Sequence, residues 1–175
     1  ESAFLKALVC LEGSVIGFRS EQHEKMSREQ LVEKLKIADD GRIYAISAAL
    51  RKDFSVEELH KLTQIDKWFL YKFQNIIKTE RKLHTEEFSV ELLKMAESMG
   101  FTDEEISLLT GKPKFIIDTL RRAHNIYPVH KIVDTCAAEF EAQTPYYYST
   151  YEDDDENVVS NDEKVVVIGS GPVRI

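Results

Sequence analysis

Apolar residues recur every three or four positions over most of the first 125 residues, which is the spacing of amphipathic helices. The first such stretch follows Ser2, and Gly13 and Gly17 are expected to end it. Its apolar positions are Ala3, Phe4, Ala7, Leu8 and Leu11. The pattern therefore predicts that the chain begins with a helix.

Further helices are predicted from capping signals, in which a hydroxyl at the N-cap is followed three residues later by Glu or Gln. Ser27 with Gln30 forms such a capping box. A wide apolar stripe predicts another helix over residues 42–52, and residues 89–99 should form one that Gly100 closes.

A weak internal repeat relates residues 54–63 to residues 101–110, an offset of 47 positions (54 to 101). The matching capping boxes are Ser55 with Glu58 and Thr102 with Glu105. Each unit predicts a short helix, a turn and a longer helix. Asp66 is the expected cap of the first long helix, and Gly111 and Pro113 mark the turn into the second.

The first long helix carries many large apolar side chains. Trp68, Phe69 and Phe73 lie at helical spacing and are interpreted as core residues. The helix has more such residues than one buried face needs, which predicts self-association through a helical face. The residues of that predicted face are Phe69, Tyr71, Phe73, Ile76 and Ile77.

The sequence pattern changes after residue 125, where the helical periodicity of apolar residues ends. Five features are predicted there: an extended segment at 127–133, a short helix at 134–142, an aromatic loop at 144–151, a solvated acidic connector from Glu152, and a buried strand at 164–168. Residues 169–172 should form the turn that ends the strand. The expected fold is therefore all-α, with about six to eight helices, followed by an extended linker and one β-strand that begins the next domain.

Composition favours one compact, soluble domain. The chain has 175 residues, of which 43% are hydrophobic and 31% charged, and its net charge is −8. This charge opposes binding to phosphate backbones or anionic membranes, so neither nucleic acid nor a membrane is an expected partner. Cys10 and Cys136 are far apart and show no metal-ligand spacing, which favours a reducing, cytoplasmic setting.

A helix, a turn and a second helix also raise the possibility of DNA binding. The second unit offers a basic set: Lys112, Lys114, Arg121, Arg122 and His124. The net charge argues against that function, and we interpret the unit as a structural helix pair whose basic residues solvate a helix face or pair with acidic groups.

Three other patterns suggest chemistry but are incomplete. Gly169-x-Gly171 after a strand resembles a dinucleotide loop, yet Arg174 stands where a third glycine belongs, and a structural turn is the preferred interpretation. Cys136 could pair with His124 or His130 as a nucleophile, although its alanine neighbours suit a small buried thiol. The acids at 152–156 lack the spacing of a calcium loop. No catalytic, cofactor-binding or metal-binding residue is predicted.

Several runs together resemble the large subunit of carbamoyl-phosphate synthetase. They are Val133-Asp-Thr-Cys-Ala-Ala-Glu-Phe-Glu-Ala142, Thr144-Pro-Tyr-Tyr-Tyr-Ser-Thr-Tyr-Glu152 and Gly169-Ser-Gly-Pro-Val-Arg-Ile175, with Ile65-Asp-Lys-Trp-Phe-Leu70 and Pro128-Val-His-Lys131 in the same order. The resemblance covers essentially the whole chain. It identifies the chain with the helical oligomerisation domain that joins the two ATP-dependent synthetase halves of that family.

The resemblance implies a domain plan. Residues 1–17 would be the last helix of the carboxyphosphate-synthesising half, 18–127 the oligomerisation domain, 128–163 a connector with the aromatic loop and acidic stretch, and 164–175 the first strand and turn of the carbamoyl-phosphate-synthesising half. The chain begins at Glu1, not Met, which fits a segment of a longer protein.

The resemblance also implies a parent ligase that makes carbamoyl phosphate from bicarbonate, glutamine-derived ammonia and two ATP, with Mg or Mn as the metal. Its ATP and metal sites would lie outside this segment, which is expected to be catalytically inert and to hold no cofactor of its own. Implied partners are the glutamine amidotransferase small subunit, the flanking synthetase domains and a second copy. The alternative is a stand-alone helical interaction or regulatory module. Neither the arginine nor the pyrimidine pathway is favoured by the sequence.

Overall fold

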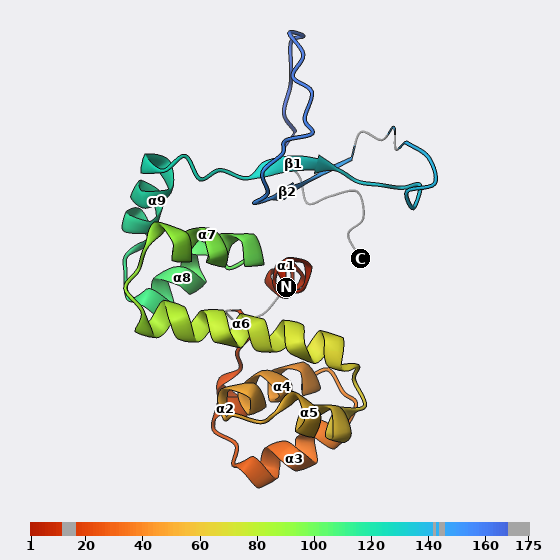
Figure 1. The fold of residues 1–175 in the computed structure, drawn as a ribbon, viewed down its shortest axis with the longest axis vertical. Helices are drawn as coiled ribbons and strands as arrows, with labels where there is room; N and C mark the ends of the chain where they lie inside the picture. Colours follow the sequence, from red (N-terminus) through yellow and green to blue (C-terminus); the bar gives the residue numbers. More distant parts are fainter. Residues whose placement is uncertain (12–16, 142, 144–145, 168–175) are drawn as a thin grey trace. The chain divides into compact units, whose positions relative to one another are not determined.

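A computed structural model describes residues 1–11, 17–141, 143 and 146–167. The chain divides into two compact units, Glu1–Pro128 and Val129–Ile175. The described helices all belong to the first unit (Figure 1). They are α1 (Ser2–Val9), α2 (Glu21–Glu24), α3 (Arg28–Lys36), α4 (Arg42–Arg51), α5 (Val56–Thr63), α6 (Lys67–Thr85), α7 (Val90–Met99), α8 (Asp103–Thr110) and α9 (Lys114–Ala123). The predicted helical domain followed by β structure is confirmed.

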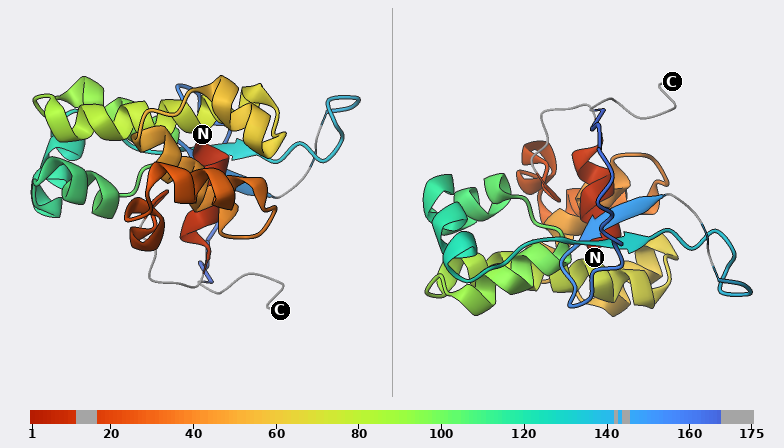
Figure 2. Two further views of the ribbon diagram at one scale, coloured as in Figure 1. Left: turned by 90° about the horizontal axis from the view of Figure 1, so that it is seen from below. Right: turned by 90° about the horizontal axis from the view of Figure 1, so that it is seen from above.

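The long helix α6 is the centre of the helical unit. It packs against α4 and α5 on one side of the unit and against α7 and α8 on the other (Figure 1), and Figure 2 gives the same helices from below and from above. Helix α1 belongs to the same unit, because Phe4 packs against Phe73 of α6 and edge-on against Phe18, with ring centroids 4.7 and 4.9 Å apart. Leu5 and Leu8 of α1 are buried. Gly13, the expected stop of this helix, lies outside the described residues.

The internal repeat is confirmed and is longer than the sequence pattern indicates. Helices α4, α5 and α6 recur as α7, α8 and α9, and core positions recur with them. The matched core pairs are Ile46 and Leu93, Ala49 and Ala96, Phe54 and Phe101, Leu59 and Ile106, and Leu70 and Ile117; every member is 6% exposed or less. Each repeat is therefore a unit of three helices, and the two repeats bury equivalent positions of these helices.

Capping explains where these helices begin and end. The boxes at Ser27, Ser55 and Thr102 all form, with side chain and backbone satisfying each other in both directions. Asp66 caps α6 through the backbone N–H of Trp68. Gly100 closes α7 with φ of +94°, a conformation that favours glycine.

The interpretation of Trp68 and Phe69 as core residues is wrong. Their exposures are 60% and 52%, whereas Leu70, Ile76 and Ile77 of the same helix are buried. At about 100° per residue, Trp68 points roughly 200° away from Leu70, and so it faces solvent when Leu70 faces the core. The predicted association face is wrong in part for the same reason, since Ile76 and Ile77 are core residues. Only Phe73 among the three aromatics joins the interior, against Phe4 and Phe18.

The second unit is built on two strands, β1 (Val129–Ile132) and β2 (Tyr147–Thr150). They pair antiparallel, with Val129 opposite Thr150 and Ile132 opposite Tyr147. The predicted extended segment at 127–133 is confirmed in β1. Part of the predicted aromatic loop is instead strand β2, because Tyr and Thr have high strand propensity and β1 supplies the hydrogen-bonding partner.

The short helix predicted at 134–142 is absent from the described residues of that range. Asp134 accepts hydrogen bonds from the backbone N–H groups of Cys136 and Ala138, at 2.8 and 2.7 Å. Ala137 and Ala138 have φ of +50° and +60°. A local side-chain acceptor thus competes with the helical hydrogen bonds and folds the segment into a turn.

The buried strand predicted at 164–168 is also wrong over its described part. Residues 164–167 are not in a strand, and Val165, Val166 and Val167 are 83–90% exposed. A strand needs a hydrogen-bonding neighbour, and the described chain supplies none for this segment. Ile168 and the Gly169 to Pro172 turn, with Arg174, lie outside the described residues.

Candidate functional site

A buried arginine fastens the first repeat. Arg51 of α4 donates to both oxygens of Glu80 on α6, at 2.7 and 2.9 Å, and to Glu24 of α2 at 2.6 Å. The Arg51 and Glu80 side chains are only 11% and 10% exposed. Burial raises the pKa of Glu80, and the Arg51 guanidinium opposes that rise. The pair holds α2, α4 and α6 in one fixed arrangement.

The second repeat also has a buried arginine. It lies in the third helix of that repeat, whereas Arg51 lies in the first helix of its own. Arg121 of α9 donates to Glu97 of α7 at 2.7 Å and to Asp103 at the start of α8. These acids raise the pKa of Arg121, while burial raises the pKa of Glu97. Oε2 of Glu97 is buried without a hydrogen-bond partner. Each repeat thus contains one buried arginine that binds two acidic residues of neighbouring helices.

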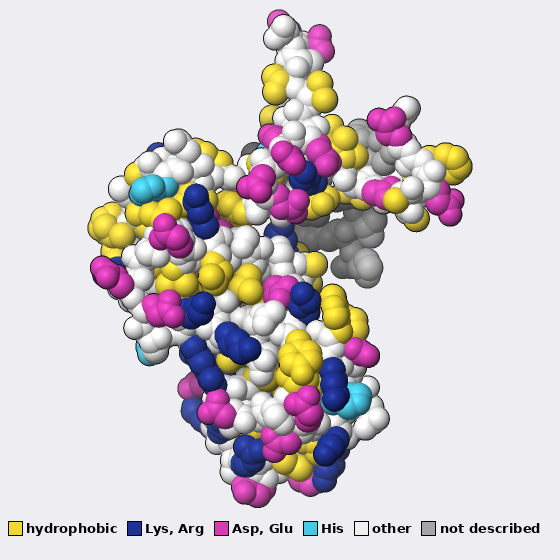
Figure 3. Space-filling view, viewed as in Figure 1, with side chains coloured by type: hydrophobic (Ala, Val, Ile, Leu, Met, Phe, Trp, Pro, Cys, Tyr) yellow, Lys and Arg dark blue, Asp and Glu magenta, His cyan; other side chains and the backbone are white. Residues whose placement is uncertain are grey.

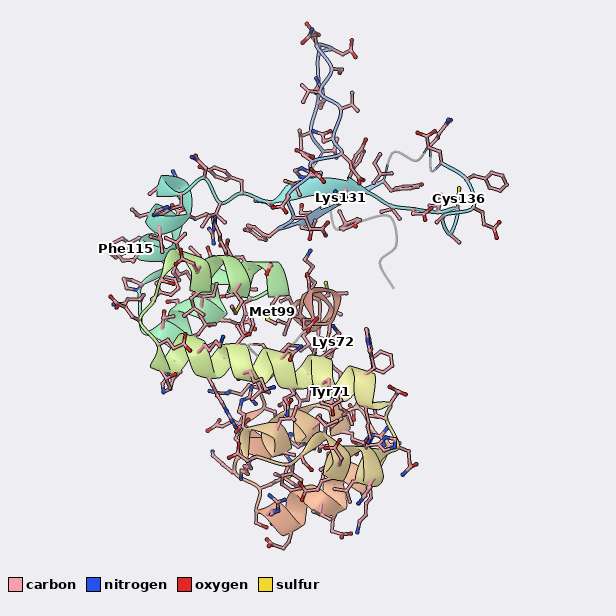
Figure 4. The ribbon with its side chains drawn as sticks, in the orientation of Figure 1. Tyr71, Lys72, Met99, Phe115, Lys131 and Cys136 are labelled. Atoms are coloured by element: carbon pink, nitrogen blue, oxygen red, sulfur yellow. The ribbon has the colours of Figure 1, made fainter. Side chains whose placement is uncertain are left out.

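The first turns of α6 and α9 present matching apolar surfaces. Trp68 and Phe69 begin α6, and Phe115 and Ile116 take the equivalent positions in α9. Their exposures are 60%, 52%, 66% and 37%. We call these four residues the paired apolar turns. Figure 4 labels Phe115 on α9 and, on α6, Tyr71 and Lys72, which adjoin the first of these turns.

The aromatic residues of the α6 turn are held in place by their neighbours. Trp68 meets Phe69 edge-on with ring centroids 4.9 Å apart, and the Lys72 ammonium lies 5.3 Å from the Trp68 ring centroid. Large side chains that are ordered but exposed are typical of interaction surfaces. The sequence showed the apolar excess of this helix but not which residues face out, because that depends on the side from which α4, α5, α7 and α8 cover it.

The acidic stretch that was interpreted as a solvated linker is partly structural. Asp155 accepts from the N–H of His130 at 3.2 Å, and Glu156 accepts from the N–H of Ile132 at 2.8 Å. The N–H of Glu156 donates to the carbonyl of His130 at 2.9 Å. The N–H groups of Asn157 and His130 lower the pKa of Asp155, and the N–H group of Ile132 lowers the pKa of Glu156. Two carboxylates therefore cover the edge of β1 that β2 leaves open, and acidic side chains gather over this unit (Figure 3).

Among the described residues, those of the incomplete chemical patterns in the sequence do not come together as a catalytic group. Cys136 is a free thiol in the turn after β1, with its Sγ 3.9 Å from the Thr135 hydroxyl, and no hydrogen bond joins it to His130 in the described structure. Gly169 and Gly171 lie outside the described residues. Over the part of the chain that is described, no three His, Cys, Asp or Glu side chains are grouped as metal ligands.

The basic set of the second repeat is used mainly in pairing. Lys114 binds Glu104, Arg121 binds Glu97 and Asp103, and Arg122 binds Asp118. This agrees with the interpretation of a structural helix pair.

The aromatic residues Tyr146, Tyr147 and Tyr148 are 43–64% exposed at the start of β2. None of the described helices combines the length and the apolar character that crossing a membrane requires.

Comparison with known proteins gives one consistent result. Residues 1–125 match the family model of the carbamoyl-phosphate synthetase large chain, oligomerisation domain. The whole chain is 46% identical to the carbamoyl phosphate synthase large chain of Clostridium acetobutylicum and 43% identical to those of Thermoanaerobacter sp. (strain X514) and Thermoanaerobacter pseudethanolicus. It spans only 16–17% of the length of these relatives. The chain belongs to the oligomerisation-domain family of the carbamoyl-phosphate synthetase large chain.

Proposed function

We propose that this segment is the structural and oligomerisation domain that joins two ATP-dependent synthetase halves within a carbamoyl-phosphate synthase large chain. The observation that carries the proposal is the pair of apolar turns on a helical unit whose own core is already complete. The repeats bury their matched core positions without Trp68, Phe69, Phe115 or Ile116. These four residues are therefore available to contact another chain or domain.

A joining role needs a spacer that keeps its shape. The buried ties of Arg51 and Arg121 support such a role, because each fixes three helices through several charge-assisted hydrogen bonds. Carbamate is labile, so a fixed relation between two distant active sites would help an intermediate pass from one to the other. We propose that the helical unit supplies this fixed relation.

The proposal extends to both ends of the segment. Residues 1–17 would be the last helix of the carboxyphosphate-synthesising half, packed through α1 onto the helical unit, and residues 164–175 would begin the half that makes carbamoyl phosphate. The exposed Val165, Val166 and Val167 support this, since such a run gains strand partners when a following sheet is present. Residues 18–127 would be the oligomerisation domain, and residues 128–163 the connector.

The parent protein would be a cytoplasmic, glutamine-hydrolysing ligase that uses bicarbonate, two ATP and Mg or Mn, with an amidotransferase small subunit as its partner. Phosphoryl transfer requires cations and metal-binding carboxylates placed around a nucleotide. We propose that the flanking halves supply these groups and that the segment itself is catalytically inert.

Sedimentation velocity over a wide concentration range tests the association role. We expect the 175-residue chain to self-associate, and the double variant Trp68→Ser, Phe69→Ser to shift the equilibrium toward monomer with an unchanged helical melt. Phe140→Ser is the matched control, since Phe140 is 75% exposed and lies in the other unit. A strictly monomeric wild-type chain would leave only the joining role. Association unaffected by the double variant would exclude the α6 turn as the interface.

A further inference from the structure

A cavity of about 390 Å³ opens in the helical unit beside the C-terminal half of α6. Its titratable lining residues are Arg19, Arg51, Glu80, Arg81 and His84. Leu108 and Leu109 of α8 form an apolar wall, and a smaller cavity next to it shares both leucines with Arg19 and Glu80. The volume is within the range of about 300–1,000 Å³ that is typical of small-molecule sites.

Basic groups predominate in the lining, although the whole chain is acidic. Three guanidinium groups and one carboxylate line the cavity, while Glu24 and Asp53, which are not lining residues, pair with Arg51 and Arg81. Arg51 is engaged by Glu80 and Glu24. Arg81 donates through Nη2 to Asp53 and to the carbonyls of Leu50 and Arg51, and water screens its pair with Asp53 because the two side chains are 50% and 79% exposed.

Arg19 is the distinctive member of the set. Unlike Arg51 and Arg81, it makes no hydrogen bond or ion pair within the described structure, yet it lies close enough to Glu80 to oppose, with Arg51, the rise in that carboxyl's pKa that burial causes. His84 donates from Nδ1 to the carbonyl of Leu109 at 3.2 Å, so Nε2 carries a proton and can donate to an anion only when the ring is in its imidazolium form. The cavity therefore holds an unused guanidinium and an unused imidazole nitrogen next to an apolar wall.

We propose that this cavity binds a small multivalent oxyanion, a phosphate ester or a dicarboxylate, between Arg19, Arg81 and His84. Guanidinium groups bind such anions through two parallel hydrogen bonds, and a partly enclosed site strengthens the attraction. The leucines of α8 would contact the apolar body of the ligand. Bound anion would connect the segment before α2 to α6 and α8, which adds a ligand-dependent tie to the helical unit. This role is independent of self-association.

The test is titration of the 175-residue chain with inorganic phosphate and, separately, with succinate, followed by backbone amide shifts in NMR spectra at constant ionic strength. We expect saturable shifts at residues around the cavity. Saturation by phosphate identifies the phosphate class and saturation by succinate the dicarboxylate class; either supports the site. Sodium chloride at the same ionic strength should leave these amides unchanged, because chloride lacks the pair of oxygen acceptors that a guanidinium group binds through two parallel hydrogen bonds.

Arg19→Gln is the decisive variant, because Arg19 has no structural partner whose loss would unfold the chain. It should weaken binding about tenfold, the effect of losing one charged hydrogen-bond donor. Arg81→Gln should weaken it similarly, and Arg122→Gln, which changes an exposed arginine of α9, should not. The proposal is overturned if neither anion saturates the cavity amides up to about 10 mM, or if Arg19→Gln and Arg122→Gln bind as the wild type does.

Discussion

Leu70 and Ile117 lie 47 residues apart in the chain, at positions 70 and 117, and are both completely buried at the same place in the two three-helix repeats. Two residues before each of them stands an exposed aromatic, Trp68 or Phe115. The repeat therefore duplicates both a buried core position and an exposed aromatic position. It gives the helical unit two equivalent cores and two equivalent apolar turns.

This arrangement predicts opposite results for neighbouring alanine substitutions. Leu70→Ala and Ile117→Ala should each lower the free energy of unfolding by about 2–5 kcal/mol, because each leaves a cavity in a closed core. Trp68→Ala should change it by about 0.5 kcal/mol or less, as exposed positions do. Urea denaturation followed by circular dichroism measures all three. A loss at Trp68 as large as that at Leu70 would contradict the exposed position of the indole.

The helical half of the fold could be predicted because its signals are local. The capping boxes at Ser27, Ser55 and Thr102 and the left-handed stop at Gly100 act within one turn of the helix, and all four are present in the structure. The direction in which Trp68 faces depends on which helices pack against α6. That is tertiary information, and the spacing of aromatic residues does not contain it.

The second unit and the cavity could not be predicted from the sequence, because they too depend on tertiary packing and not on local signals. The turn at Asp134 forms because one side chain accepts two backbone N–H groups, and the edge of β1 is covered by acids 25 and 24 residues further along the chain. Arg19, Arg81 and His84 are likewise brought to one cavity by the packing of separate elements. A run of five acids was visible in the sequence, but their strand partners were not.

The buried pair of Arg51 and Glu80 should be costly to break and inexpensive to replace. Glu80→Ala leaves the Arg51 charge with only Glu24, and we expect a loss of about 3–5 kcal/mol in unfolding free energy. The double variant Arg51→Met, Glu80→Leu fills the same space with apolar groups and should recover most of that loss. Urea titration of the two variants decides the question. A double variant no more stable than Glu80→Ala would mean that the charges themselves stabilise the fold.

Two glycines with nearly the same backbone conformation should respond differently to alanine. Gly17 and Gly111 have φ of +69° and +66°, so alanine strains both by about 1 kcal/mol. At Gly17 the new Cβ would also lie 2.2 Å from Oε1 of Glu105, whereas at Gly111 it meets open space. Glu105 is held by the capping box with Thr102, so displacing it should cost about 1 kcal/mol more.

A double-mutant cycle separates the backbone strain at Gly17 from the steric clash with Glu105. In a Glu105→Ala background the obstructing carboxylate is gone, and the effect of Gly17→Ala on the thermal unfolding midpoint should fall to that of Gly111→Ala. If Gly17→Ala remains the more harmful change in that background, the close approach to Glu105 is not its cause.

The edge of β1 should open in acid. Asp155 and Glu156 have pKa values below their ordinary 3.8 and 4.5, because backbone N–H groups donate to the ionised forms, those of Asn157 and His130 to Asp155 and that of Ile132 to Glu156. Their contribution to stability is therefore complete above the ordinary values and is lost as pH falls through the lower, folded values. Hydrogen exchange at the amides of His130 and Ile132, corrected for intrinsic rates, should accelerate over that range.

Two comparisons make this assignment specific. Asp155→Asn with Glu156→Gln keeps an oxygen acceptor that does not titrate, so the acid-dependent acceleration at His130 and Ile132 should disappear. Glu80 and Glu97 have raised pKa values, so their protonation favours the folded helical unit as pH falls, and the amides of α6 should show no matching acceleration. Acceleration that persists in the Asn and Gln variant would assign it to another group.

The proposed joining role makes a prediction for the intact parent enzyme. Leu70→Ala loosens the centre of the helical unit without touching any group that would bind a nucleotide, so bicarbonate-dependent ATP cleavage should fall little. Carbamoyl phosphate formed per ATP cleaved should fall further, because a loosened spacer lets labile carbamate escape between two separated sites. Lys61→Ala, an exposed change on the adjacent helix α5, should alter neither quantity. Equal losses of ATP cleavage and product in the Leu70 variant would mean that the unit supports folding of the halves and does not couple them.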